Sequence, residues 1–173
     1  DYISGDVNDE TAIERGLDGC SAVHVSLSAV GTAEEIDRVE HRGTARVAQL
    51  AARLGSIHLT YVSGGLVSED HLTFPSHRAK FQAERAIRES GVAYTIFKPT
   101  YFIDTLPRHV QGRWAIVLGR QPHPLHMIAG RDFSGMVSRA LTTPEARNRE
   151  FVVHGPEGIT IADALRLYCS MLR

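Results

Sequence analysis

Short β-rich runs alternate with helical segments along most of this chain. Apolar and β-branched residues favour strands at 22–27, 57–62, 94–98, 114–118 and 151–153. Apolar residues at helical spacing favour helices at 8–19, 32–54, 76–89, 132–141 and 161–172. Several links between the strands are too long for hairpins and carry a helix. The pattern therefore predicts an α/β fold, a doubly wound parallel sheet with right-handed crossovers.

Glycine, proline and capping residues mark the ends of these elements. Gly55 and Gly91 follow helical segments and can adopt the left-handed conformation that ends a helix. Pro99 ends the strand 94–98, because proline has no backbone N–H for a sheet. Asp132 is expected to cap one helix, and the sequence 160–163 resembles a capping box that opens the last.

Size, charge and cysteine content narrow the class of protein. The 173 residues, 43% hydrophobic and 23% charged, are typical of one globular domain. The net charge of -1 argues against nucleic acid as a direct partner. No apolar run approaches the roughly 18 residues of a membrane span, and the start DYISGDVNDE is unlike a signal peptide. Cys20 and Cys169 are expected to be reduced thiols of a cytoplasmic protein, with a disulfide as the alternative.

Polar residues and glycines gather where the expected strands end. In an open α/β sheet, ligands bind beyond the carboxyl ends of the strands. That rule selects the ranges 5–6, 26–29, 63–65 and 99–102. Lys80 lies one turn into the helix that follows Ser63. The hydroxyl and the ammonium are therefore expected to share one crevice.

The order of these pieces resembles the NmrA-like proteins, atypical short-chain dehydrogenases/reductases with an NAD(P)-binding, Rossmann-like fold. GDVND resembles the end of the third strand in that family, and GCSAVHVSLSAV its fourth strand. HRGTARVAQLAARLG resembles the next helix, and YVSGG carries the serine of the fifth strand. AKFQAERAIRESGVAYTIFKPTYF resembles the lysine helix and sixth strand, and FVVHGPEGITIADAL the late strand and helix near the substrate. The resemblance covers nearly the whole chain.

The resemblance implies a dinucleotide cofactor, NAD(P) with NADP preferred, and a small-molecule substrate. Asp6 would accept a hydrogen bond from the adenine amino group, and Lys80 would donate to the nicotinamide ribose hydroxyls. Ser63 would hold a substrate carbonyl or the carboxamide of the cofactor. The expected cofactor contacts are Asp6, Val7, Leu27, Ser28, Ala29, Ser63, Lys80, Pro99, Thr100 and Phe102.

Each of these residues also has a structural interpretation. Lys80 could be a solvated lysine paired with Glu84 one turn later. Ser63 could satisfy a turn at a strand end, and Asp6 could be an ordinary cap. The aromatic residues beside Thr100 could belong to the core. Only the resemblance favours the functional roles over these alternatives.

Two departures from the family matter. No G-x-x-G-x-x-G turn, which would bind the pyrophosphate at a helix N-terminus, occurs in the sequence. We therefore expect an N-terminally truncated domain that lacks its first β-α-β unit of roughly 30 residues. In this interpretation residues 1–173 form one partial domain. The ranges 103–131 and 150–173 would contribute a small substrate-side lobe.

The second departure is the catalytic tyrosine of the wider superfamily, Tyr-x-x-x-Lys. Ser76 stands four residues before Lys80, and a serine hydroxyl is a far weaker acid than a phenol with a pKa of about 10. His77 is expected to lie on the same helix face as Lys80 and could donate the proton instead. The expected catalytic residues are therefore Lys80, Ser63 and His77.

Two functions follow from this pattern. The first is an NAD(P)H-dependent reductase of a small carbonyl or quinone-type substrate, because such acceptors need no strong protein acid. The alternative is a catalytically weak, dinucleotide-sensing redox regulator that acts through a protein partner. A nucleotide-sugar epimerase or dehydratase ranks last, because that branch usually keeps the tyrosine. No metal site is expected, since prolines flank His123 and disfavour a helical ligand pair with His126.

Overall fold

The computed structural model describes residues 2–117 and 119–172 of the chain. Its main helices are α1 (Glu10–Leu17), α2 (Ala33–Ile36), α3 (Thr44–Leu54), α4 (Pro75–Ser90), α5 (Gly130–Thr142) and α6 (Ile161–Met171). A π-helical segment, η1 (Asp37–Gly43), joins α2 to α3, and three 3₁₀ segments are η2 (Glu69–His71), η3 (Ile103–His109) and η4 (Pro144–Ala146). The strands are β1 (Ala22–Val25), β2 (His58–Val62), β3 (Ala93–Pro99), β4 (Val110–Gln111), β5 (Trp114–Ala115), β6 (Leu125–His126), β7 (Arg149–Val153) and β8 (Gly158–Ile159).

The four longest strands form one parallel sheet in the order β1-β2-β3-β7. Val25 pairs with Tyr61, and Tyr61 pairs with Ile96, so the strands are in register at their carboxyl ends. Their connections carry helices, as a parallel sheet requires. The prediction of an α/β fold with a parallel sheet is confirmed.

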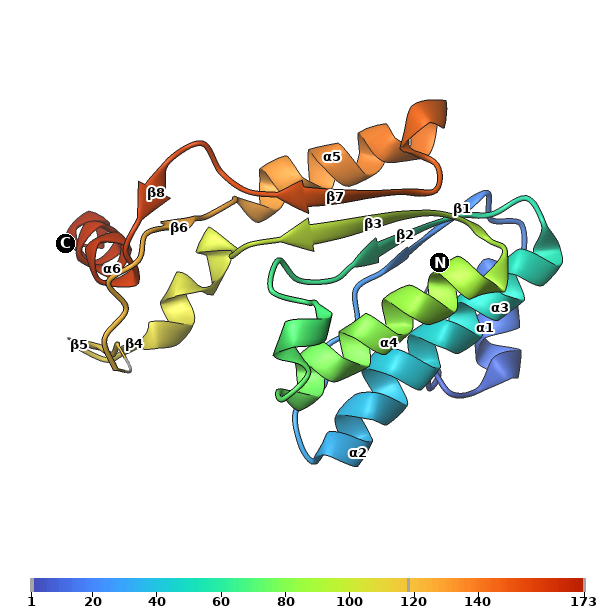
Figure 1. Cartoon of the computed structure of the whole chain (residues 1–173), viewed down its shortest axis with the longest axis horizontal. Helices are drawn as coiled ribbons and strands as arrows, with labels where there is room; N and C mark the ends of the chain where they lie inside the picture. Colours follow the sequence, from blue (N-terminus) through green and yellow to red (C-terminus); the bar gives the residue numbers. More distant parts are fainter. Residues whose placement is uncertain (1, 118, 173) are drawn as a thin grey trace.

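Helices cover both faces of this sheet (Figure 1). α1, α3 and α4 pack on one face, where the largest core cluster includes Leu50, Leu59 and Ile87. α5 packs on the other face, where Phe133 and Val137 meet Phe97. The sheet is therefore doubly wound, and its buried strands carry the apolar runs that such a position requires.

Several predicted boundaries are confirmed and others differ. Gly55 and Gly91 end α3 and α4 with φ angles of +74° and +80°. The expected strand 114–118 is shorter, because only Trp114–Ala115 pairs, with β4; Leu118 lies outside the described residues. α5 begins at Gly130 with Ala129 as N-cap, so Asp132 lies in the first turn and does not cap the helix. The helix 32–54 contains the π segment η1.

A third core cluster lies beyond the carboxyl end of the sheet. Its buried residues come from η3, α6 and the chain before α5: Leu106, Met127, Ile161, Ala164 and Leu165. Figure 1 shows these elements with the small strands β4, β5, β6 and β8 at one end of the molecule. We call this part the C-terminal lobe. Residues 150–153, which the sequence assigned to such a lobe, lie in the sheet as part of β7.

Three backbone hydrogen bonds join the C-terminal lobe to the sheet. Ile128 N–H donates to the Tyr101 carbonyl and Ile103 N–H donates to the Ile128 carbonyl. Gly155 N–H, just after β7, donates to the His126 carbonyl. We call these bonds the seam. They continue the hydrogen-bonded order of the sheet into the lobe.

Other features of the described chain bear on its class. Cys20 and Cys169 are free thiols, as predicted. Across residues 2–117 and 119–172, no helix combines the length and apolar character that crossing a membrane requires.

Two histidines in strands of the sheet, His24 in β1 and His58 in β2, have a pKa below the ordinary histidine value. Thr95 donates its hydroxyl to the Ala146 carbonyl, so it accepts from His58 Nε2–H, 2.9 Å away. The other ring nitrogen of His58, Nδ1, is then unprotonated, and it is buried with no hydrogen-bond partner among the described residues. Burial and then the charge of Arg147 lower the pKa of His58, and burial lowers the pKa of His24.

We therefore expect the free energy of unfolding to decrease as the pH falls from about 7.5 to 5.5. This window spans the ordinary histidine pKa of about 6.5, and within it the unfolded chain, whose histidines keep that pKa, binds more protons than the folded chain. The His58→Gln variant should show a shallower pH dependence, by at most about 1.4 kcal/mol per pH unit. Urea unfolding at three pH values measures it. His123→Gln, in an exposed loop, is the control, and equal slopes for wild type and His58→Gln would contradict the expectation.

Candidate functional site

The carboxyl ends of β1, β2 and β3 meet at one edge of the sheet. The Ser63 N–H donates to the Phe97 carbonyl and the Gly65 N–H donates to the Pro99 carbonyl, both at 2.8 Å. A Cβ on Gly65 would lie 3.2 Å from the Thr100 Cα, so a side chain there would crowd the next strand. The predicted ranges 63–65 and 99–102 are thus adjacent.

Lys80, on α4, reaches the end of β1 at this edge. Its ammonium nitrogen donates to the Leu27 carbonyl at 3.2 Å and lies 3.2 Å from Glu40 Oε2. It also lies 5.8 Å from the centre of the Tyr61 ring, and the side chain is only 19% exposed. Lys80 is therefore neither solvated nor paired with Glu84, and that structural alternative is wrong.

Glu40, on the π segment, is the partner that orders this corner. It is 2% exposed, and Oε1 accepts a hydrogen bond from the Ala29 N–H at 2.9 Å. Oε2 makes no hydrogen bond within the described structure, so its contact with Lys80 is an ion pair. Ala29 therefore contacts the Glu40 carboxylate and Leu27 contacts the Lys80 ammonium, and Ser28 lies between them in the chain.

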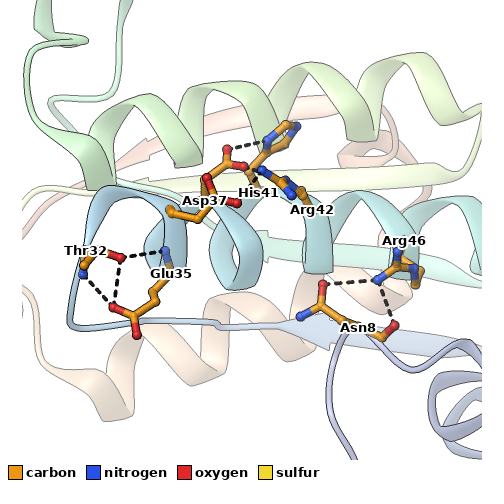
Figure 2. A network of polar contacts seen from close by, with 8 residues as sticks. Asn8, Thr32, Glu35, Asp37, His41, Arg42 and Arg46 are labelled. Carbon is orange, nitrogen blue, oxygen red and sulfur yellow. Dashed lines mark hydrogen bonds and ion pairs between the residues drawn. The ribbon is translucent and has the colours of Figure 1, made fainter.

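Polar contacts also fix the two ends of the segment that carries Glu40. Thr32 and Glu35 form a capping box at the start of α2. Figure 2 shows this box, the bonds of Asp37 to His41 and Arg42, and the contacts of Arg46 with Asn8. Burial alone would raise the pKa of Asp37, but bonds to His41 and Arg42 outweigh it and lower that pKa. Asp37 is therefore an anion near neutral pH.

Ser63 faces a second buried carboxylate. Its hydroxyl donates to Glu84 Oε1 at 2.5 Å, and Ser63 is 5% exposed. Glu84 Oε2 lies 2.9 Å from both Arg88 and Lys98, which also pair with Glu150. The single proton of the Ser63 hydroxyl is used by Glu84, so toward any other group Ser63 offers only its lone pairs.

Tyr61 lies between these two ion-pair groups and does not act as an acid there. Its hydroxyl is buried and has no hydrogen bond within the described structure. Burial first, and then the charges of Glu40 and Glu84, raise the pKa of Tyr61 far above its ordinary value. The phenol therefore keeps its proton at neutral pH.

The residues before α1 lie beside the π segment. Asp6 is exposed, accepts hydrogen bonds from Asn8 and pairs with Arg38 at 3.2 Å. The backbone bond from Asn8 is the main reason that the pKa of Asp6 is lowered. Val7 is half-buried against Gly43, where a Cβ would lie 2.7 Å from a Val7 methyl group.

The segment after β3 joins the sheet edge to the C-terminal lobe. Thr100 donates its hydroxyl to the His126 carbonyl. Phe102 packs edge-on against Phe133, with ring centres 5.1 Å apart. The hydroxyl of Tyr101 lies 2.9 Å from His109 Nε2. The side chains of Thr100 and Phe102 are therefore already engaged by the protein, and Pro99 is buried.

His77 lies in the first turns of α4, close to the end of the preceding loop. Its ring contacts Phe74 and His71 edge-on, with ring centres 5.4 and 6.5 Å away. Nδ1 is buried without a hydrogen-bond partner among the described residues. Ser76 is half-buried one position earlier. Within residues 2–117 and 119–172, no group of three or more His, Cys, Asp or Glu side chains could hold a metal ion.

Sequence reasoning missed Glu40 and the burial of Glu84, the two glutamates that organise this edge, although signals for them exist. Glu40 precedes Gly43 and Thr44 at helical spacing, on the buried face that continues through α3. A carboxylate on an apolar face requires a cation. Only two of the 19 lysine and arginine residues are lysines, and each, Lys80 and Lys98, pairs with one buried glutamate.

Comparisons with known proteins show the family to which this chain belongs. The model of the family described as NAD(P)H-binding matches residues 1–144. A (4-alkanoyl-5-oxo-2,5-dihydrofuran-3-yl)methyl phosphate reductase of Streptomyces griseus is 28% identical over 163 residues, 92% of this chain and 55% of that protein. The photosystem II assembly factor Ycf39 of Trieres chinensis is 25% identical over 177 residues, 99% of this chain and 55% of that protein. The chain thus spans about half the length of these curated relatives.

A solved structure shares the fold. The triphenylmethane reductase of Citrobacter sp., complexed with NADP(H), superposes with a TM-score of 0.74 and 16% identity. The similarity covers 96% of this chain and 57% of the reductase. At this identity the likeness shows the fold, and the match over residues 1–144 shows the family. The chain belongs to the NAD(P)H-binding family.

Proposed function

We propose that this protein is an NAD(P)H-dependent reductase of a small carbonyl or quinone-type substrate. The family binds NAD(P)H, and both the Streptomyces relative and the Citrobacter neighbour are named as reductases. A bound NAD(P)H would supply the hydride, so the chain itself needs to bind the dinucleotide, orient it and exclude water. A preference for NADPH over NADH is part of the proposal.

The observation that carries the proposal is the position of Lys80. An ammonium group has three N–H donors. In Lys80, one donates to the Leu27 carbonyl and a second is used by the ion pair with Glu40. The remaining N–H can reach a ribose hydroxyl above the strand ends. The absence of a side chain at Gly65 leaves room for close approach at the neighbouring strand end. These features fit the nicotinamide ribose half of a dinucleotide.

The other predicted residues take proposed roles consistent with their contacts. Ser63 would accept a hydrogen bond, which suits the N–H₂ of the cofactor carboxamide better than a substrate carbonyl, because Glu84 uses its proton. Leu27, Ser28 and Ala29 would contact the cofactor through the backbone at the end of β1. Pro99, Thr100 and Phe102 would flank the nicotinamide, and Asp6 and Val7 would lie near the adenine.

The test of the proposal is binding followed by turnover in the full-length protein. We expect calorimetric titration to detect NADPH or NADH, and we expect oxidation of the bound form, followed at 340 nm, with at least one acceptor. The panel comprises quinones, aldehydes, unsaturated lactones and triphenylmethane dyes. If neither dinucleotide binds, the proposed function is wrong. If a dinucleotide binds but no acceptor oxidises it, the reductase assignment fails.

We propose His77 as the group that supplies the proton in place of the superfamily tyrosine. The His77→Ala variant should lower kcat about tenfold, less than the roughly 100- to 10,000-fold typical of general acid–base catalysis, because quinone-type acceptors need little protein acid. His71→Ala, from the same aromatic cluster, is the matched control and should keep wild-type kcat. Steady-state kinetics at saturating NADPH measures kcat for both variants. Equal kcat values would rule out His77 as the proton donor.

A second candidate is a dinucleotide-sensing regulator that acts through a protein partner. Ser76 at the tyrosine position favours it, as does the relative named as an assembly factor. Such a protein would discriminate between the oxidised and the reduced dinucleotide and show no turnover. Titrations with NAD, NADH, NADP and NADPH, followed by a partner pull-down and the oxidation assay described above, separate the two candidates. A regulator discriminates between the redox states, binds a partner and shows no turnover, whereas a reductase shows turnover whatever its preference.

A further inference from the structure

Glu40 is a charged residue of a helical segment, and its side chain is buried. It lies in the π segment Asp37–Gly43, and such segments occur frequently at functional sites. The Thr44 hydroxyl donates to the Glu40 carbonyl at 2.7 Å, and Thr44 is fully buried. The side chain of Glu40 is 2% exposed and points into the molecule, where it meets α4 and the end of β1.

The two oxygens of Glu40 contact two different elements. Oε1 accepts from the Ala29 N–H, in the loop after β1, and Oε2 pairs with Lys80 of α4. Lys80 closes the group by donating to Leu27, two residues before Ala29. A buried anion in this position is stabilised only while both partners stay in place, because an unpaired buried charge is costly.

We propose that Glu40 is a positioning residue, which fixes the Lys80 ammonium and the turn 27–29 in the geometry that receives the ribose of the dinucleotide. The proposal rests on the proposed dinucleotide site. A lysine side chain has four rotatable bonds and loses much rotamer freedom when it is fixed. Glu40 keeps Lys80 fixed before the ligand arrives, so that the ligand does not have to order it.

The chain offers a direct measurement of this role, because its lysines are only Lys80 and Lys98. Pulse acylation of the full-length protein, followed by peptide mass spectrometry, reports each amine separately. The Glu40→Gln variant retains an oxygen for the Ala29 N–H and removes the charge that holds Lys80. We expect several-fold faster acylation at Lys80 and an unchanged rate at Lys98.

A control separates positioning from general destabilisation. Thr44→Val removes the hydroxyl bond within the same helical region and leaves the carboxylate in place. We expect it to lower thermal stability while the Lys80 acylation rate stays at the wild-type value. If Glu40→Gln leaves the Lys80 rate unchanged, or if Thr44→Val raises it as much, the positioning role is overturned. Neither result depends on a dinucleotide.

A coupling measurement then links the role to the ligand. Glu40→Gln should weaken NADPH binding about tenfold, because the ligand would then have to order the Lys80 side chain itself. In a Lys80→Met background the same change should have little further effect, because Glu40 acts through Lys80. Equal losses in both backgrounds would overturn the proposal. Failure of the unmodified protein to bind either dinucleotide would instead overturn the proposed function, and the acylation result would still test the positioning of Lys80.

Discussion

Replacement of Lys80 with methionine is expected to weaken NADPH binding about 10- to 100-fold. Methionine keeps the apolar stem of the side chain and removes the ammonium. A hydrogen bond from a charged donor contributes about 1.5–3 kcal/mol, which corresponds to this change in Kd. Isothermal titration of the full-length protein measures the effect. Circular dichroism should accompany it, because the substitution also leaves Glu40 without its cation.

The control for this variant is Arg85→Met. Arg85 is another cation of α4, but it is exposed and pairs only with Glu89 within the described structure. Its removal changes the net charge equally and should leave the Kd within about twofold, since exposed pairs contribute little. Equal affinities of the Lys80 and Arg85 variants for NADPH would show that Lys80 does not contact the dinucleotide.

The Glu84→Ala variant is expected to lose about 3–5 kcal/mol of the free energy of unfolding. Glu84 is 1% exposed, and its carboxylate is shared by Ser63, Arg88 and Lys98. Removing one member of a buried charged group leaves the others uncompensated, which accounts for a loss of this size. Urea unfolding, with the midpoint and slope determined together, measures it.

Two further variants provide comparisons for the stability loss of Glu84→Ala. Glu84→Gln keeps the volume and an acceptor for Ser63, so it should cost less than Glu84→Ala. Glu89→Ala removes an exposed carboxylate from the same helix and should change stability by no more than about 0.5 kcal/mol. If Glu84→Ala proved as mild as Glu89→Ala, the network would contribute nothing to folding.

Local signals in the sequence were sufficient for most of the fold. The β-branched runs at 22–27 and 57–62 became β1 and β2, and Gly55 and Gly91 ended their helices as predicted. Lys80 was located correctly on the helix after β2. These features depend on neighbours in the chain, and periodicity and turn residues report such neighbours directly.

The partners of the candidate site depend on contacts between residues distant in the chain, and local patterns in the sequence do not identify which residues pair. Lys80 pairs with Glu40, 40 positions earlier in the chain, and not with Glu84 one turn away. The π segment changes the helical register by an amount that no propensity predicts. Ser63 was identified at its strand end, but the use of its proton by Glu84 follows only from the packing of α4 on the sheet.

The seam between the sheet and the C-terminal lobe limits how this molecule can move. Rotation of the lobe as a hinged body would have to break the bonds of Ile103, Ile128 and Gly155 together. Hinges in proteins usually run through a few residues that can change their φ and ψ angles freely, and a hydrogen-bonded junction resists that change. The seam therefore resists rotation of the lobe against the carboxyl edge of the sheet. We expect conformational change at this edge to be confined to side chains and exposed loops.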